Sequence, residues 1–522
     1  MDLFKRTSLI KQLQESSHWD VIVVGGGATG LGVALDSATR GFKTLLLEQV
    51  DFAKGTSSRS TKLVHGGVRY LAQGNIDLVR EALYERGLLL KNAAHLVKDQ
   101  SFIIPNYKWW DNFLYTVGLK MYDFLAGKLS FGKSIRINKK ETSERLETIK
   151  TKGLKGGVMY HDGQFDDSRL AVNIAQTCIE KGATVLNHCK VKELLKSEQG
   201  FVNGVITEDT ETNISYKVNA KVVINATGVF TDEILQMDNA DAKNIVRPSQ
   251  GVHLVLDQSF LPGNDAIMIP KTDDGRVLFL VPWHDKVVVG TTDTLLDSHS
   301  LEPKPLEEEV DFILETANRY LNKKVNRNDV LSIFAGLRPL AAPKDKSEKT
   351  KEISRSHKII VSNSKLITIT GGKWTTYRRM AQDTMNRAIL VGKLPNKKCQ
   401  TKQLSIHGNS NKVDRKNHLY IYGSDQKAIN QLIKESPELR EKLHERLAYT
   451  KAEIVWAIRH EMARTVEDIL ARRVRALFLD AKAAIEITPV VASMLAKELG
   501  KDDFWKEQQI KEFTAIAKRY VL

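Results

Sequence analysis

The residues best placed to do chemistry begin with three glycines near the start of the chain. Gly25, Gly27 and Gly30 fit the pattern G-x-G-x-x-G directly after the apolar run from Val21 to Val24. In that pattern the first glycine allows a tight turn, the second lets a pyrophosphate approach the backbone, and the third permits close helix–strand packing. Glu48 ends a second apolar run, where a carboxylate can accept hydrogen bonds from ribose hydroxyls. The spacing predicts a dinucleotide-binding strand–helix–strand unit, with phosphate at the helix N-terminus.

A second segment with chemical potential reads TSSRSTKLVHGGVRYL, at 56–71. Its hydroxyl groups and backbone N–H groups can ligate a pyrophosphate, and its His-Gly-Gly step lets the backbone pass close to a flat ring. Arg69 is left to meet a substrate anion. Farther along, a strand at 222–225 runs into Ala-Thr-Gly at 226–228. Small residues there leave room for a cofactor at the carboxyl edge of a sheet, although an ordinary strand-to-loop turn would look the same.

The elements that must position these residues form three groups. Strands and helices alternate around the glycine pattern, whereas short β-type runs such as GVHLVL, RVLFLVPW and LSIFAGLRPL recur between 246 and 344. Beyond residue 400 the periodicity is helical. We expect an α/β chain (α+β overall) with a Rossmann-like nucleotide-binding domain, a mostly antiparallel β substrate-cap domain and a helical C-terminal domain. The expected bounds are 16–95, 150–245 and 345–395 for the first, 96–149 and 246–344 for the second, and 400–522 for the third.

Composition narrows the partners but does not choose among them. The 522 residues carry a formal net charge of +15, which attracts nucleic acid, an acidic membrane surface or phosphorylated metabolites alike. No run approaches the roughly 18 uninterrupted apolar residues that span a bilayer, and the N-terminus lacks a secretory signal. The chain has three cysteines, Cys178, Cys189 and Cys399, and their spacing is not typical of a metal or redox site. We therefore expect inert thiols in a reducing compartment and no metal site.

Nine motifs, in order, give the chain a resemblance to a known family: GGGATG with Glu48, TSSRSTKLVHGGVRYL, FDDSRL, NATG, GVHLVL, VPW…GTTDT, GLRPL, GGKWTTYR and RHEMARTVEDILARR. The chain resembles the FAD-dependent glycerol-3-phosphate dehydrogenases, of bacterial type, in the D-amino-acid-oxidase-like superfamily. The resemblance covers most of the chain and implies an FAD-binding domain. It also implies that sn-glycerol 3-phosphate is oxidised to dihydroxyacetone phosphate by hydride transfer to FAD, with electrons passed to a membrane quinone. The expected location is cytoplasmic, peripheral to the inner face of the cytoplasmic membrane. Whether the protein forms a homodimer is left open, and no nucleic-acid partner is expected.

The resemblance also implies site residues. Arg69, Tyr70 and Lys373 match groups that hold the substrate phosphate, and Arg355 is a weaker match because its surroundings depart from the pattern. His253 and Arg338 match residues beside the reacting C2 carbon, so both are expected to bind substrate and act in catalysis. The expected cofactor-binding residues are Gly25, Gly26, Gly27, Thr29, Gly30, Glu48, Thr56, Ser57, Ser58, Ser60, Gly66, Gly67, Gly228, Lys373, Trp374 and Thr375.

The two expected catalytic residues differ in acidity. His253 is the better base, because the reference pKa of histidine is about 6.5, while arginine above about 12 is a poor base but a good electrostatic partner. Which of the two takes the C2 hydroxyl proton stays open. His253 could also be an ordinary core residue, and Arg338, which precedes a proline, could cap a turn. FDDSRL is simplest as a helix start, with Asp166 or Asp167 as the cap and Arg169 exposed.

Three alternatives remain for the function. An α-glycerophosphate oxidase would use dioxygen and make hydrogen peroxide, although such enzymes carry an insert for which this chain has little room. An amine or amino-acid oxidising flavoenzyme would need a site for a single carboxylate. A basic, flavin-containing nucleic-acid-binding protein would explain the charge, but no such motif is present. The aromatic and lysine-rich stretch at 108–133 is either an interfacial amphipathic element or a buried helix of the substrate domain.

Overall fold

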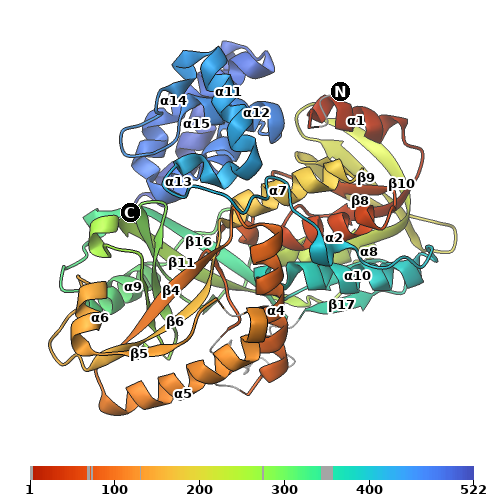
Figure 1. The fold of residues 1–522 in the computed structure, drawn as a ribbon. Helices are drawn as coiled ribbons and strands as arrows, with labels where there is room; N and C mark the ends of the chain where they lie inside the picture. The colour runs from red at the N-terminus through yellow and green to blue at the C-terminus, as the bar shows by residue number, and fades with distance from the viewer. Residues whose placement is uncertain (1–3, 68–70, 72–73, 130, 273–274, 342–356) are drawn as a thin grey trace.

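The first sheet carries the glycine pattern. The computed structural model describes residues 4–67, 71, 74–129, 131–272, 275–341 and 357–522 (Figure 1). The strand order in this sheet is β17-β18-β10-β1-β2-β7, and β10, β1, β2, β7 and β18 run parallel. An antiparallel extension pairs β8 with β9 and β9 with β10. The strands are β1 (Trp19–Val24), β2 (Thr44–Leu47), β7 (Thr184–Leu186), β8 (Cys189–Lys196), β9 (Val202–Asp209), β10 (Ile214–Asn225), β17 (Lys358–Val361) and β18 (Ile367–Thr370).

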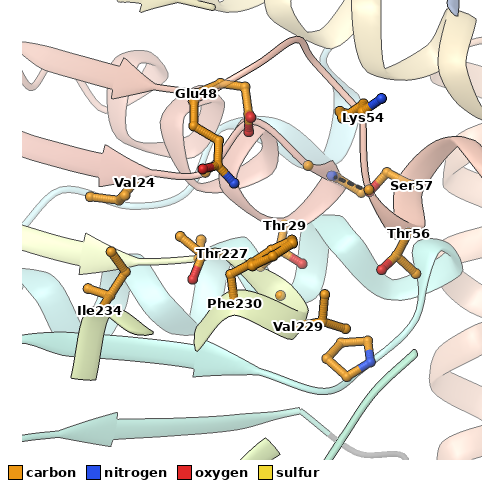
Figure 2. A pocket seen from close by; sticks show the side chains of 18 of the residues that line it. Val24, Thr29, Glu48, Lys54, Thr56, Ser57, Thr227, Val229, Phe230 and Ile234 are labelled. Carbon is orange, nitrogen blue, oxygen red and sulfur yellow. Dashed lines mark hydrogen bonds between the residues drawn. The ribbon is translucent and has the colours of Figure 1, made fainter. Parts of the chain in front are cut away.

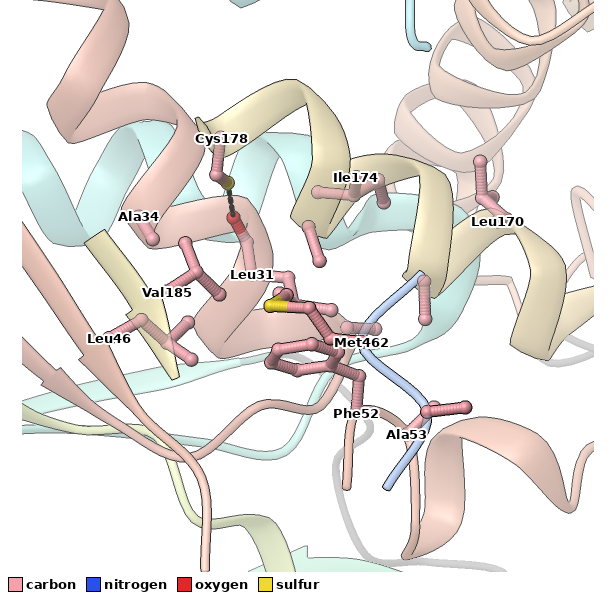
Figure 3. Packing of buried hydrophobic residues seen from close by; sticks show 14 of the residues in the cluster. Leu31, Ala34, Leu46, Phe52, Ala53, Leu170, Ile174, Cys178, Val185 and Met462 are labelled. Carbon is pink, nitrogen blue, oxygen red and sulfur yellow. Dashed lines mark hydrogen bonds between the residues drawn. The ribbon is translucent and has the colours of Figure 1, made fainter. Parts of the chain in front are cut away.

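Helices cover this sheet closely. The helix α2 (Ala28–Thr39) packs between α7 (Asp167–Glu180) and α10 (Tyr377–Val391). A Cβ at Gly32 would lie 2.8 Å from the Tyr377 ring, so α2 can approach α10 only without a side chain there. Figure 3 shows Leu31, Phe52 and Met462 in one apolar cluster, which therefore joins the sheet to the C-terminal part of the chain. The remaining helices beside this sheet are α1 (Arg6–Glu15) and α8 (Thr231–Asp238).

The second sheet is mostly antiparallel. Its strand order is β15-β11-β14-β13-β12-β4-β6-β3, with β16 paired to β11 and β5 paired to β6; only β12 and β4 run parallel among its described pairs. The strands are β3 (Leu63–Val64), β4 (Lys98–Asn106), β5 (Ile135–Ile137), β6 (Gly156–Gln164), β11 (Val246–Asp257), β12 (Ala266–Ile269), β13 (Leu278–Trp283), β14 (Lys286–Gly290), β15 (Thr294–Leu295) and β16 (Val330–Ala341). Helices around it are α4 (Ile76–Asn92), α5 (Trp109–Ala126), α6 (Lys139–Arg145) and α9 (Glu307–Tyr320).

The membership of β3 and β6 differs from the sequence-based division. Both lie in ranges expected for the nucleotide-binding domain, yet they pair within the second sheet. The cause is the pairing of β6, because β4 forms a long antiparallel ladder with it from Lys98↔Gln164 to Asn106↔Gly156. Since β3 and β5 also pair with β6, this strand has no free edge for the first sheet. The chain therefore passes between the two sheets more often than periodicity alone indicates.

Residues beyond 400 are helical, as the periodicity predicts. They include α11 (Gln426–Glu435), α12 (Lys451–His460), α13 (Ala476–Leu479), α14 (Ala481–Leu499) and α15 (Asp503–Ala517). These helices gather at one end of the molecule, beyond α7 (Figure 1). We call residues 400–522 the helical domain. Within the described part of the chain, no helix is both long and apolar enough to cross a membrane.

Candidate active site

A cavity of about 190 Å³, here called cavity one, lies at the carboxyl ends of β1, β2 and β10 (Figure 2). This is the edge at which open parallel sheets bind their ligands. Many of the residues expected to bind the cofactor line it: Gly25, Gly27, Thr29, Glu48, Thr56, Ser57, Gly228, Lys373 and Trp374. Segments far apart in the sequence therefore converge here, as the motifs predict.

The glycine turn of cavity one has room for backbone only. A Cβ at Gly30 would lie 1.9 Å from the carbonyl oxygen of Gly25, and a Cβ at Gly25, where φ is +109°, would lie 2.7 Å from the carbonyl oxygen of Ala226. Gly228, in contrast, is not crowded, since nothing lies within 4 Å of its Cβ position, but its φ of +62° is in the region that favours glycine. The Ser57 hydroxyl accepts a 2.9 Å hydrogen bond from the Ala28 amide at the start of α2. This arrangement fits a dinucleotide pyrophosphate.

Glu48 lies at the rim of this cavity with its carboxylate already oriented. The amides of Gly26 and Val50 donate to its two oxygens at 2.7 and 2.9 Å. Burial raises the pKa of Glu48, against the opposing effect of these two donors. Each oxygen keeps further lone-pair capacity, so the carboxylate can still accept from ribose hydroxyls.

A second cavity of about 180 Å³, cavity two, lies on the far side of the loop at 56–67. Thr56 and Ser57 of this loop line cavity one, while Thr61 and His65 line cavity two. The other polar residues of cavity two are Asp162, Arg276, Thr291, Thr292, Asp293 and Arg338, and its wall also includes Phe102, Tyr160, Met268 and Phe279. The two cavities therefore share a wall, and cavity two carries cationic groups suited to an anion.

Arg338 reaches cavity two from β16, where it pairs with Ser249 of β11. Its guanidinium donates to the carbonyl oxygens of Gln250 and Thr292 at 3.2 and 3.1 Å, and to the Thr291 hydroxyl at 3.1 Å. The alternative that Arg338 caps a turn is wrong, because the residue lies within a strand. Several acceptors fix the plane of the guanidinium at the cavity wall.

His253 lies behind the wall of cavity two and is 2% exposed. Its Nε2 is 2.9 Å from the Thr61 hydroxyl, and its ring stacks on Phe334 at 4.8 Å. Burial, with smaller effects of the charges on Lys62 and Arg338, holds the pKa of His253 well below its ordinary value. The pKa of His253 therefore lies below the reference value of histidine, and the sequence did not reveal the burial that lowers it. The imidazole is neutral at physiological pH.

Family comparisons agree with these motifs. A family described as FAD dependent oxidoreductase matches residues 20–378, and one described as the C-terminal domain of alpha-glycerophosphate oxidase matches residues 362–509. The probable mitochondrial glycerol-3-phosphate dehydrogenase of Caenorhabditis elegans is 40% identical, over 97% of this chain and 74% of that protein. The mitochondrial glycerol-3-phosphate dehydrogenase of Schizosaccharomyces pombe is 38% identical, over 97% of this chain and 88% of that protein.

A solved structure shows the same similarity across the whole fold. The glycerol-3-phosphate dehydrogenase from Bacillus halodurans, complexed with FAD, superposes with a TM-score of 0.81 at 30% identity, covering 100% of this chain and 98% of that chain. This chain belongs to the FAD-dependent glycerol-3-phosphate dehydrogenase family. The resemblance, the fold class and FAD as the cofactor are confirmed. The L-alpha-glycerophosphate oxidase of Mycoplasma pneumoniae, at 18% identity and a TM-score of 0.55, shares the fold.

Other residues expected at the family's cofactor site lie next to cavity one or away from it. The Ser60 amide and hydroxyl both donate to Asp167, and the carbonyl of the buried Ser58 accepts from Lys62. Gly67 lines cavity two, and the Gly66 amide donates to the Tyr122 hydroxyl at 2.8 Å. Gly26, Gly30 and Thr375 flank lining residues without being lining residues themselves.

The expected phosphate-binding residues are only partly covered by the structure. Lys373 lines cavity one and not cavity two, which supports contact with the cofactor more than with the substrate. Arg69, Tyr70 and Arg355 lie outside the described residues.

The FDDSRL motif begins α7, as expected. The Asp166 carboxylate caps the helix by accepting from the Arg169 amide at 3.0 Å. The expectation that Arg169 is exposed is wrong. Its guanidinium is fully buried and donates to both oxygens of Glu461 at 2.7 Å. The helical domain covers this face of α7, which the local sequence could not indicate.

Sequence reasoning missed two residues of cavity two. Arg276 precedes β13 and lies over the Phe312 ring at 4.7 Å, while Thr61 joins the cavity to His253. Both stand in segments already noted, but their roles depend on which strands pair. Only the assembled second sheet brings Arg276 near Arg338.

Proposed function

We propose that this chain oxidises sn-glycerol 3-phosphate to dihydroxyacetone phosphate, with FAD in cavity one and the substrate in cavity two. The observation that carries the proposal is the shared wall, in which the loop at 56–67 lines both cavities and Arg338 and Pro339 line one cavity each. Such a wall allows a substrate carbon to approach a flat ring held between the cavities. The three similar proteins at 30% identity or more that are described above are glycerol-3-phosphate dehydrogenases, and their names support this substrate.

The side chains of cavity two suit a phosphorylated alcohol. Arg276 and Arg338 supply charge for a dianionic phosphate or a developing alkoxide, and guanidinium groups bind such oxygens through paired N–H donors. When bound, FAD supplies the acceptor for the C2 hydride. The protein itself has to orient the substrate and accept the hydroxyl proton.

The proton has a route through Thr61. His253 does not line the cavity, but the Thr61 hydroxyl lies on the wall and is 2.9 Å from His253 Nε2. We assign Thr61 to pass the C2 hydroxyl proton to the neutral imidazole, since a hydroxyl can donate on one side while accepting on the other. A positioned base of this kind contributes on the order of 10²–10⁴-fold to the rate.

The first prediction is that glycerol 3-phosphate bleaches the flavin absorbance of the purified protein under anaerobic conditions. Addition of a quinone analogue should restore the yellow colour. Glycerol and D-alanine serve as controls, because one lacks the phosphate and the other tests amine oxidation. Absence of bleaching would refute the proposed function. Rapid peroxide formation in air with slow quinone reduction would instead favour the oxidase.

We further propose that electrons pass to a membrane quinone and that α5 contacts the membrane surface. Val117, Met121 and Phe124 are 54%, 46% and 83% exposed, and their spacing places them on one face of α5. The opposite face, with Leu119 and Tyr122, is buried. The buried face agrees with the expectation of a packed helix, and the exposed apolar face supports the proposed membrane contact. In Figure 1, α5 lies along the edge opposite the helical domain.

The second prediction concerns this face. Phe124→Ser should weaken binding to vesicles containing anionic lipid by roughly 10-fold or more, because burying a phenylalanine contributes about 1.5–3 kcal/mol. Co-sedimentation measures the effect. Phe504→Ser is the matched control, since Phe504 is 81% exposed on α15 of the helical domain. Equal losses in the two variants would argue against α5 as the contact.

A further inference from the structure

We propose that the helical domain is a positioning element of the active site, acting through Arg475 on the loop that separates the two cavities. Arg475 donates from Nη2 to the Ser58 carbonyl at 2.8 Å and to the Asp167 carboxylate at 3.2 Å. The inference rests on the proposed placement of FAD in cavity one. It assigns the helical domain a role that neither its periodicity nor its family description indicates.

The loop is held from its own side by Lys62. Its ammonium donates to the Ser58 carbonyl and to Asp167, each at 2.7 Å, and Asp167 also accepts from the Ser60 hydroxyl at 2.7 Å. Ser58 and Asp167 thus each accept a hydrogen bond from Lys62 of the loop and another from Arg475 of the helical domain. The three charged side chains, Lys62, Asp167 and Arg475, are fully buried.

Aromatic rings and backbone geometry reinforce this cluster. The Lys62 ammonium lies 5.4 Å from the Phe478 ring of α13 and 5.1 Å from Phe334, the ring that stacks on His253. Lys62 and Arg475 have φ of +63° and +54°, in the left-handed region that side chains other than glycine rarely adopt. Such backbone persists where surrounding contacts over-determine it, as this cluster does.

A second set of contacts holds the segment just before this loop. Asp51 accepts from Arg472 at 2.5 Å and from Arg473 at 2.7 Å. Lys54, which lines cavity one, donates to Glu467 at 2.5 Å and also to Glu302. The helical domain therefore contacts the segment before the loop, at Asp51 and Lys54, and the loop itself at Ser58.

What the loop carries explains why its position matters. Ser57 receives the amide of Ala28 at the glycine turn, and Thr61 bonds His253. A shift of the loop would disturb the pyrophosphate end of cavity one and the proton route of cavity two together. Buried ion pairs add little stability compared with apolar packing, whereas they fix geometry where they bind backbone groups. Arg475 donates to the backbone of the loop itself.

The test compares variants of the holoenzyme by the rate at which FAD dissociates, measured as the rise in flavin fluorescence after dilution. Arg475→Met should release FAD at least 10-fold faster and lower the rate constant of flavin reduction more than it changes KM. Arg475→Lys, which keeps the charge but not the paired donors, should give a smaller acceleration, about 3-fold. It serves as the second variant if the methionine protein does not fold.

Arg464→Met is the matched control. Arg464 also joins the helical domain to the first sheet region, donating to both oxygens of Glu211 at 2.8 and 2.7 Å, but it lines neither cavity. It should leave FAD release within 2-fold of the wild type. Equal acceleration by the Arg464 and Arg475 variants, or none in either Arg475 variant, would overturn the inference. If the wild-type protein binds FAD but glycerol 3-phosphate does not bleach it, the proposed function fails while this inference stands.

Discussion

Replacing Gly30 with alanine is expected to weaken FAD binding by at least 100-fold. The new Cβ would lie 1.9 Å from the Gly25 carbonyl oxygen. The oxygen is part of the backbone turn proposed to hold the pyrophosphate, and the Cβ is bonded directly to the backbone of α2. Neither can move aside as a flexible side chain could. The start of α2 would have to separate from β1, which would carry the amide of Ala28 away from Ser57. The amides at the start of α2 would then no longer converge on a phosphate.

The measurement is the flavin content of the purified variant together with an FAD titration followed by fluorescence. Gly118→Ala is the matched control, because Gly118 lies within α5 and a Cβ there meets nothing within 4 Å. Alanine at a helix interior is favourable by up to about 1 kcal/mol, so the control should fold at least as well as the wild type. Full FAD occupancy in Gly30→Ala would show that the turn does not hold the pyrophosphate.

The nucleotide-binding unit could be predicted from sequence because its determinants are local. The apolar run at 21–24, the glycines that follow it and Glu48 lie within one strand–helix–strand unit. The positive φ of Gly25 and the close approach of Gly30 to the Gly25 carbonyl oxygen both arise within that unit. The same is true of the Asp166 cap, whose acceptor is three residues from its donor. Local geometry of this kind repeats wherever the spacing does.

Charge burial could not be predicted, because its determinants are distant in the sequence. Arg169 looks exposed within FDDSRL, yet its partner Glu461 comes from the helical domain 292 residues away. The pKa of His253 depends on burial and on the charges of Lys62 and Arg338, which come from two segments distant from it in the sequence. Arg276 reaches cavity two only through the order of strands in the second sheet. The residues named from the sequence therefore account for more of the lining of cavity one than of cavity two.

Replacing Arg338 with methionine should slow anaerobic flavin reduction by roughly 10²–10³-fold while leaving FAD bound. The guanidinium is fixed at the wall of cavity two by several acceptors, so its charge is oriented before the substrate arrives. Losing one pre-oriented donor to a developing oxyanion costs about 2.7–4 kcal/mol of transition-state stabilisation. Stopped-flow absorbance with glycerol 3-phosphate measures the rate. Arg338→Lys should recover only part of it, because an ammonium cannot reproduce the planar paired donors.

The same variant should also move the pH dependence of reduction, and the direction follows from His253. Burial first, and then the charges of Lys62 and Arg338, hold the pKa of His253 below its ordinary value. The neutral imidazole accepts the proton, so the rate of reduction falls as pH drops through that lowered pKa. This fall is the acid limb of the plot of rate against pH. Removing the Arg338 charge raises the pKa, and the acid limb of the rate profile should shift to higher pH. Arg338→Lys keeps the charge and should keep the limb in place.

Arg327→Met controls for the loss of an arginine as such, since Arg327 pairs with Glu307 and Asp311 at the surface. It should change neither the rate nor the acid limb. If Arg338→Met slows reduction but leaves the acid limb unmoved, the guanidinium acts on the charge of the substrate and does not influence the pKa of His253. An unchanged rate would contradict the catalytic assignment of Arg338 altogether. Both results can be distinguished because the rate reports charge at the substrate, whereas the limb reports charge at the imidazole.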